Sequence, residues 1–255
     1  MVQVQEVLAE KKPEIIYPDS DGQPMADNTK QFRWIVIVKE NLEILFAPID
    51  DLFVAGDLLW YPVEGDNTIR QAPDVMVVFG RPKGDRGSYR QWEEDNIAPQ
   101  VVFEILSPGN RLKEMTRKLG FYERYGVQEY YIYDPERMCL DGLQRSGGSL
   151  EEIRQMNGWV SPRLGIRFEL TSNGLEIYRP DGRKFLTPVE LDRLREQEHQ
   201  RAEREHQRAE QEHQRAEQER QRALEAITQL EQEQQRYQYL IARLRQQGID
   251  PEQLS

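Results

Sequence analysis

The chain has 255 residues, a formal net charge of -11 at pH 7 and one cysteine. A chain with this charge lacks the overall basic character that dominates nonspecific binding of nucleic acids. It does not exclude a site that binds a divalent cation, because such an ion supplies positive charge locally. The single cysteine excludes an intrachain disulfide and a cysteine-based zinc site.

The composition changes abruptly near Pro188, which predicts two parts. Most aromatic residues, Gly and Pro precede this point, whereas Glu, Gln, Arg and Ala dominate after it. We find no signal peptide, and the apolar run Ile35–Val38 is too short to span a bilayer, so we expect a cytoplasmic protein with no membrane partner. The expected parts are an irregular arm (1–27), a globular domain (28–187), a helical tail (188–247) and a flexible end (248–255).

The first predicted elements are a helix and two strands. Apolar residues recur at helical spacing over residues 28–46, behind Asn28 or Thr29 as a cap. Residues 51–61 and 74–79 are rich in the β-branched and aromatic residues typical of strands.

A strand, a helix and a second strand are predicted next. After a long polar loop (80–99), residues 100–106 form an almost unbroken apolar run, the pattern of a central strand covered on both faces. Residues 111–125 have helical character and 129–133 are β-rich, so the two strands should be parallel, joined by a right-handed crossover. Turn signals between Leu140 and Tyr178 predict antiparallel hairpins on the far side of the sheet. The expected fold is α/β, with a mixed sheet flanked by helices.

Chemically useful side chains occur on three of these elements. Glu104 is a carboxylate within an apolar strand, which is costly unless it is paired, hydrogen-bonded or bound to a metal. Taken alone, Glu104 is better explained by a salt bridge to a helix residue or by an edge position facing water. Asp74 alone is better explained by the common Pro-Asp entry into a strand or turn. The helical row Glu114, Lys118 and Tyr122 is typical of a solvated face. Together, however, two carboxylates and a lysine can hold a divalent cation and stabilise a phosphate under attack.

The order of these motifs resembles a known family. Pro73-Asp74-Val75, residues 102–108, Lys118 with Tyr122, and residues 126–135 are similar to the signature of the Uma-two (Uma2) family of restriction-endonuclease-like proteins, within the PD-(D/E)xK nuclease superfamily. The resemblance covers roughly residues 20–180. It implies a restriction-endonuclease-like core and DNA as the substrate.

The resemblance also implies a set of site residues. Asp74, Glu104 and the backbone carbonyl of Ile105 would ligate Mg²⁺, with Mn²⁺ able to substitute, and the ion would activate a water and polarise the phosphate. Lys118 would orient the water or stabilise the developing charge. Glu114 and Tyr122 would support these groups.

The sequence departs from the superfamily pattern at three places. Leu106 stands where the strand lysine of the (D/E)xK element is expected, and Lys118 on the next helix occupies the matching position of the Uma2 relatives. Glu114 replaces the usual Asp one turn earlier, and the early His of the family is missing near residues 28–30. An active site of this kind therefore depends on Lys118.

The tail repeats with a period of seven. In heptad notation, position d is occupied by Ala202, Ala209, Ala216 and Ala223, and position a by His199, His206 and His213. Positions a and d together form the seam of a coiled coil, and larger apolar residues occupy this seam only in its last third. Glu fills the early e and g positions, which disfavours a parallel dimer there. We therefore expect a coiled-coil-like tail that forms a homo-oligomer, or binds a partner helix, through residues 223–245.

Two hypotheses of different classes follow. The first is a Mg²⁺-dependent endonuclease that hydrolyses DNA phosphodiester bonds, favoured by the intact Asp74, Glu104 and Lys118. The second is a catalytically lapsed interaction protein that assembles or docks through its helical tail. The acidic composition and the tail favour the second.

Overall fold

A computed structural model describes residues 15–20, 22, 26, 28–109, 112–246 and 248. Within these residues the main feature is a six-stranded sheet with the strand order β1-β3-β5-β6-β7-β8. The mixed α/β fold is confirmed. The strands of this sheet are β1 (Leu52–Gly56), β3 (Val75–Phe79), β5 (Val101–Ile105), β6 (Glu129–Asp134), β7 (Cys139–Ser146) and β8 (Ser149–Glu152).

The first helix begins and ends close to its predicted bounds. Helix α1 spans Thr29–Leu45, and the Asn28 side chain caps it by accepting hydrogen bonds from the backbone N–H of Lys30 and Gln31, at 3.0 and 2.9 Å. Its apolar stripe is buried against the sheet. The spacing of apolar residues thus predicted the helix.

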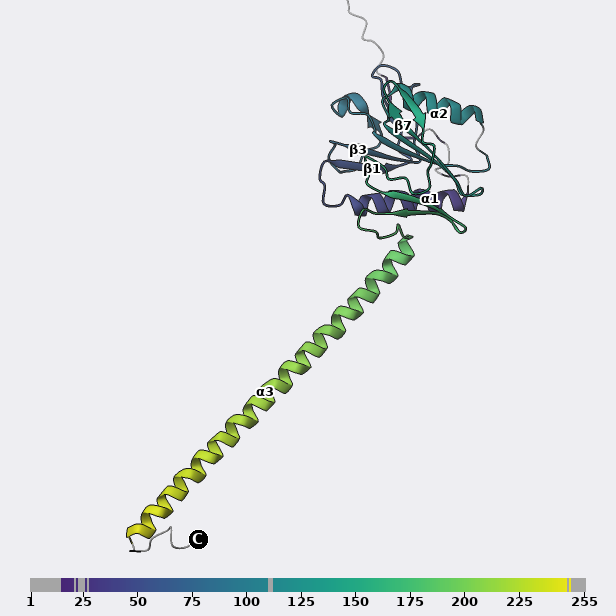
Figure 1. Cartoon of the computed structure of the whole chain (residues 1–255). Helices are drawn as coiled ribbons and strands as arrows, with labels where there is room; N and C mark the ends of the chain where they lie inside the picture. The colour runs from purple at the N-terminus through teal and green to yellow at the C-terminus, as the bar shows by residue number, and fades with distance from the viewer. Residues whose placement is uncertain are drawn as a thin grey trace, which may run out of the picture. The chain divides into compact units, whose positions relative to one another are not determined.

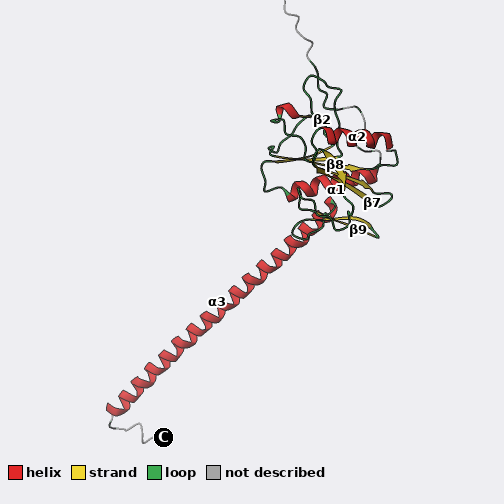
Figure 2. Cartoon of the chain, turned by 45° about the horizontal axis from the view of Figure 1, so that its top comes forward, coloured by secondary structure: helices red, strands yellow, loops and turns green. Residues whose placement is uncertain are grey.

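Two layers cover the sheet on opposite faces (Figure 1). One face packs against α1, in a core that includes Val75, Val77 and Phe103. The other face packs against α2 (Leu112–Arg124), in a core that includes Met76 and Val102. Figure 2 shows the strands lying between the two helices. Side chains at even numbers on β3 and β5 therefore point toward α2.

The predicted βαβ unit is confirmed. β5 and β6 are parallel neighbours, with Val101 opposite Glu129 and Ile105 opposite Tyr133, and α2 is the crossover between them. All five residues of β5 are buried, as expected of a central strand. This unit fixes α2 over the even-numbered face of β5.

The single strand predicted over 51–61 is wrong. The chain leaves β1 after Gly56 and turns at Asp57, whose φ of 48° is incompatible with a strand, before forming the separate strand β2 (Trp60–Tyr61). β2 pairs in parallel with β4 (Tyr89–Arg90). The predicted loop over 80–99 therefore contains β4, followed by a short 3₁₀ helix (Gln91–Glu93).

The predicted hairpins are present, but they occupy two different places. β7 and β8 form an antiparallel pair at the edge of the main sheet. β9 (Arg167–Thr171) and β10 (Gly174–Tyr178) form a separate two-stranded sheet, and Phe168 and Ile177 belong to the core on the α1 face. The second hairpin thus covers a face of the main sheet rather than extending its edge.

The last helix, α3, spans Pro188–Gln246 and has no buried residue. By its internal contacts the chain divides into two units, Met1–Leu191 and Asp192–Ser255. Most of the predicted N-terminal arm (1–27) and of the predicted flexible end (248–255) lies outside the described residues. No helix in the described part of the chain is both long and apolar enough to cross a membrane.

Candidate active site

The two predicted carboxylates lie side by side on neighbouring strands. Asp74 immediately precedes β3 and Glu104 is the fourth residue of β5. These strands are antiparallel, with Val75 opposite Phe103, so the same register places Asp74 opposite Glu104. Both numbers are even, which directs both side chains toward α2. Strand pairing alone therefore brings the two acids together.

Helix α2 supplies two side chains that bind Glu104. Lys118 Nζ lies 2.6 Å from Glu104 Oε2, and the Tyr122 hydroxyl donates to Glu104 Oε1 at 2.5 Å. Lys118 and Tyr122 are four residues apart and share one helix face. They are the two buried residues of α2. Both oxygens of Glu104 are therefore held, and the predicted meeting of Glu104 with Lys118 occurs.

The cluster is almost closed to water. Asp74, Glu104 and Lys118 are only 8 %, 2 % and 7 % exposed. Burial, followed by the charge of Glu104, raises the pKa of Asp74 well above its usual value. Burial also raises the pKa of Glu104, against the lowering effect of Lys118 and Tyr122. For Lys118 burial acts to lower the pKa, but the neighbouring carboxylates outweigh it and the pKa is raised.

Ile105 is held at both of its backbone polar groups. Its N–H donates to Asp74 Oδ2 at 2.5 Å, and its carbonyl oxygen accepts from Gln31 Nε2 at 2.8 Å. A carbonyl oxygen has two lone pairs, so the bond from Gln31 is compatible with a second ligand. Gln31 is not among the site residues predicted from the sequence. The available signal was a polar residue four positions before the buried Ile35, on the inner face of α1.

The remaining predicted positions differ in how closely they approach the cluster. Glu114 forms no hydrogen bond with Lys118 within the described residues, but its charge contributes to the raised pKa of Lys118. Leu106 follows β5, and its N–H donates to the Tyr133 carbonyl at 2.8 Å. The ammonium group beside Glu104 is that of Lys118.

The donor set fits a small, hard cation. Two carboxylates and one carbonyl are oxygen ligands, and Mg²⁺ is commonly held by one or two carboxylates together with water. No group of three or more His, Cys, Asp or Glu that could hold a metal occurs in the described part of the chain. The protein would therefore contribute Asp74, Glu104 and the Ile105 carbonyl. Two acids facing one ammonium in a buried cluster would be stabilised by an added cation.

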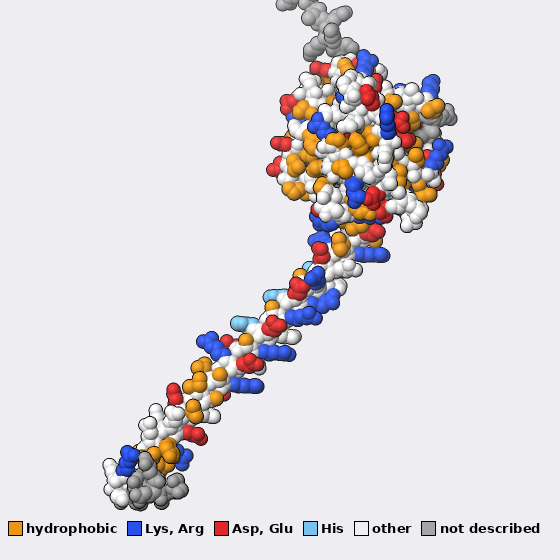
Figure 3. Space-filling view, viewed as in Figure 1, with side chains coloured by type: hydrophobic (Ala, Val, Ile, Leu, Met, Phe, Trp, Pro, Cys, Tyr) orange, Lys and Arg blue, Asp and Glu red, His pale blue; other side chains and the backbone are white. Residues whose placement is uncertain are grey.

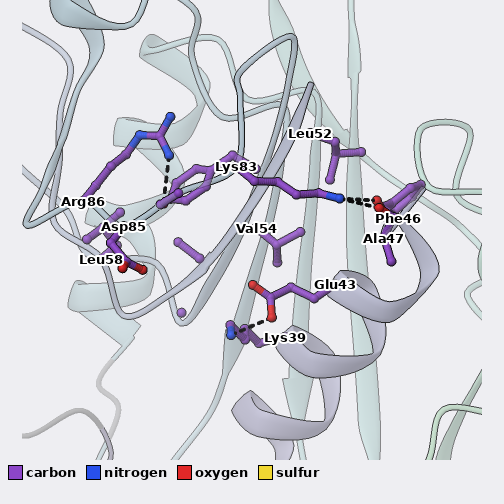
Figure 4. Close-up of a pocket in the computed structure, with 14 residues that line it drawn as sticks. Lys39, Glu43, Phe46, Ala47, Leu52, Val54, Leu58, Lys83, Asp85 and Arg86 are labelled. Atoms are coloured by element: carbon purple, nitrogen blue, oxygen red, sulfur yellow. Dashed lines mark hydrogen bonds and ion pairs between the residues drawn. The ribbon is translucent and has the colours of Figure 1, made fainter. Parts of the chain in front are cut away.

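A separate cavity of about 490 Å³ lies along the edge strand β1 (Figure 4). Its cations already have partners. Lys39 Nζ is 2.8 Å from Glu43 Oε2, Lys83 donates to two carbonyls at the end of α1, and Arg86 Nε lies 2.6 Å from Glu94 Oε1. This cavity contains none of the predicted site residues.

Comparison with known protein families identifies the family of this chain. The model of the Uma2 family, described as "Putative restriction endonuclease", matches residues 23–228. The chain belongs to this family. No curated protein matches it. Among solved structures it is similar to a protein from Anabaena variabilis described as a "putative nuclease belonging to DUF820", with 17 % identity and a TM-score of 0.40 over 53 % of this chain and 72 % of that one.

Proposed function

We propose that this protein is a Mg²⁺-dependent endonuclease that hydrolyses phosphodiester bonds of DNA. The supporting observation is the buried cluster in which Asp74 and Glu104 lie on adjacent strands and Lys118 contacts Glu104 at 2.6 Å. Membership of the Uma2 family supports the same function. The proposal assigns the chemistry to the predicted domain of residues 28–187.

Each residue of the cluster has a distinct role in this proposal. A bound Mg²⁺ would lower the pKa of an attacking water and polarise the phosphate. Asp74, Glu104 and the Ile105 carbonyl would hold that ion. Tyr122 and Gln31 fix the ligands, because each donates a hydrogen bond to one of them.

Lys118 is the proposed group that stabilises the charge on the phosphate. Its ammonium lies 2.6 Å from Glu104 Oε2, so in the proposed site it would lie near the phosphate as its charge increases. A cation held in a buried site stabilises such charge far more than it would in water. Lys118 is therefore the proposed electrostatic group, and cleavage of DNA by the purified chain in Mg²⁺ tests the assignment.

A second proposed function, assembly, is supported by the exposed apolar side chains of α3. Leu224, Ile227 and Leu230 are each more than half exposed, and Tyr237 is 67 % exposed. In Figure 3 such side chains gather in the last third of the helix. Because no residue of α3 is buried, these apolar side chains are accessible to a partner helix. We propose that residues 223–245 join copies of this chain as a coiled coil.

Deleting residues 190–255 tests this assembly. We expect the truncated chain to have a lower oligomeric order and an unchanged melting transition for the remaining unit, because α3 buries no side chain. Light scattering gives the particle mass, and circular dichroism gives the transition. If the number of chains per particle is the same before and after truncation, the tail does not mediate assembly.

A further inference from the structure

A cavity of about 560 Å³ is lined by residues that lie close in sequence to the acidic cluster. Its lining includes Ala72, two residues before Asp74, and Arg117, which precedes Lys118 on α2. The cavity is therefore lined in part by the segment that precedes Asp74 and by the helix that carries Lys118. Arg70 enters the same lining from the segment that leads into β3.

The lining of this cavity differs in charge from the protein as a whole. The chain carries a net charge of -11, yet the cavity is lined by two arginines and by no carboxylate. Arg70 Nη1 donates to the Tyr61 hydroxyl at 3.5 Å, and neither arginine forms an ion pair within the described residues. The cations of the cavity in Figure 4, by contrast, are matched by acids or carbonyls.

We propose that this cavity binds a backbone phosphate of DNA, next to the phosphate that is cleaved. Guanidinium groups offer paired N–H donors that match phosphate oxygens. Asn67, Thr68 and Gln71 add polar groups to the same lining. The inference rests on the proposed function, and it explains how an acidic protein would position a polyanion over two buried carboxylates.

The salt dependence of DNA binding tests this site. Fluorescence anisotropy on a labelled duplex in EDTA, which prevents metal-dependent cleavage, gives the affinity of the full chain at several salt concentrations. The slope of log K against log salt is negative, and each lost phosphate contact reduces its magnitude by about 0.9. We expect the double variant Arg70→Gln/Arg117→Gln to reduce the magnitude of the slope by about 0.9, the value for one lost phosphate contact, and each single variant to reduce it by less.

Two further variants make the result specific. Arg154→Gln removes the same charge from an exposed position after β8, at the other edge of the sheet, and should leave the slope unchanged. Arg70→Lys keeps the charge and should show nearly the wild-type slope. It replaces Arg70→Gln in the comparison if that variant proves unstable. A double variant with the wild-type slope overturns this site and leaves the proposed nuclease intact. A wild-type chain that binds no DNA overturns both.

An independent inference comes from the tail. With a positions at residues 199 to 241 and d positions at residues 202 to 244, the first half carries His at a and Ala at d. The second half carries larger residues, including Ile227, Leu230, Ile241 and Leu244. Polar and small seam residues are thus separated along the helix from large apolar ones.

A parallel dimer would use this seam poorly. Equal positions would face each other, so His would oppose His, Arg220 would oppose Arg220 of the second copy, and Ala would oppose Ala without filling the seam. Across the flanks Glu205 would face Glu210 of the second copy and Glu212 would face Glu217 of the second copy. Each of these pairs repels and occurs twice by symmetry.

We infer that α3 pairs with α3 of a second copy in the antiparallel direction. In that arrangement a positions face d positions of the other helix. Ala202 then packs against Ile241 and Ala216 against Ile227, so a small residue meets a large one. His213 faces Leu230. The flanking charges do not distinguish the two directions, because in the antiparallel pair Glu210 faces Glu231 and Glu212 faces Glu233 of the second copy. The inference therefore rests on the packing of the seam.

A distance between spin labels distinguishes the two directions. In the full chain with Cys139→Ser, a nitroxide is placed at Arg204→Cys, on the outer position f. Antiparallel helices place the two labels about 35 residues apart along the axis, or about 52 Å, whereas parallel helices place them about 20 Å apart. Pulsed electron resonance measures this distance.

Gln218→Cys is the matched control, because it is also at f but lies near the centre of the helix. Its labels should be close in both directions and thus show that the dimer has formed. A distance near 50 Å at residue 204 together with a short distance at residue 218 supports antiparallel pairing. Short distances at both residues overturn it, and no dipolar signal at either residue overturns the assembly itself.

Discussion

Glu104→Ala should abolish Mg²⁺-dependent cleavage of DNA. The substitution removes a proposed metal ligand and the acceptor of two hydrogen bonds, from Lys118 and Tyr122. We expect a loss of at least about a hundredfold, the effect of removing one group that stabilises a transition state. It also leaves the buried Lys118 ammonium without its partner, which typically costs about 3–5 kcal/mol of stability. Nicking of a supercoiled plasmid measures the activity.

Glu104→Gln separates the loss of charge from the loss of structure. Glutamine keeps the shape of the side chain and can still accept a hydrogen bond, so circular dichroism should show a folded protein. Its activity should be as low as that of Glu104→Ala, because an amide is a poor ligand for Mg²⁺ beside a single remaining carboxylate. Wild-type cleavage by the folded Gln variant would remove Glu104 from the active site.

Lys118→Met should lower cleavage by about 10² to 10³ while metal binding is retained. Methionine fills the buried volume but carries no charge, so the phosphate loses its proposed electrostatic partner. The two carboxylates remain and lose a competing cation, which favours a divalent ion at the same place. Cleavage kinetics and calorimetric titration with Mg²⁺ measure the two effects separately.

Lys113→Met is the matched control for Lys118→Met. Lys113 is an exposed residue on the same helix, α2, so the substitution changes the net charge equally. Its activity should stay within about twofold of wild type, as is usual for surface substitutions away from a site. An equal loss in both variants would mean that overall charge, and not the position of Lys118, determines activity.

The sequence predicted those parts of the site that depend on local pattern. The apolar run around Glu104 indicated a central strand, and the spacing of Lys118 and Tyr122 placed both on one face of α2. The strand-helix-strand order then brought that face over Glu104. These steps needed only the period of side-chain direction, which is 2 residues in a strand and 3.6 residues in a helix, and the handedness of the crossover.

Contacts distant in sequence were not predictable in the same way. Gln31 and Ile105 are 74 positions apart, and no local pattern links a helix amide to a strand carbonyl. The expected long strand breaks at Asp57, where φ is 48° and the N–H donates to the Asp74 carbonyl at 3.2 Å. Likewise β4 forms only because β2 lies beside it. In each case tertiary pairing outweighed local propensity.

The metal dependence of cleavage tests the central claim most directly. The purified full-length chain is incubated with single- and double-stranded DNA in EDTA and in increasing Mg²⁺ or Mn²⁺. With Asp74, Glu104 and the Ile105 carbonyl as ligands, we predict no product in EDTA and cleavage that rises and saturates with the ion. Cleavage in EDTA, or intact DNA at every concentration of both ions, would contradict a metal-dependent nuclease built on this cluster.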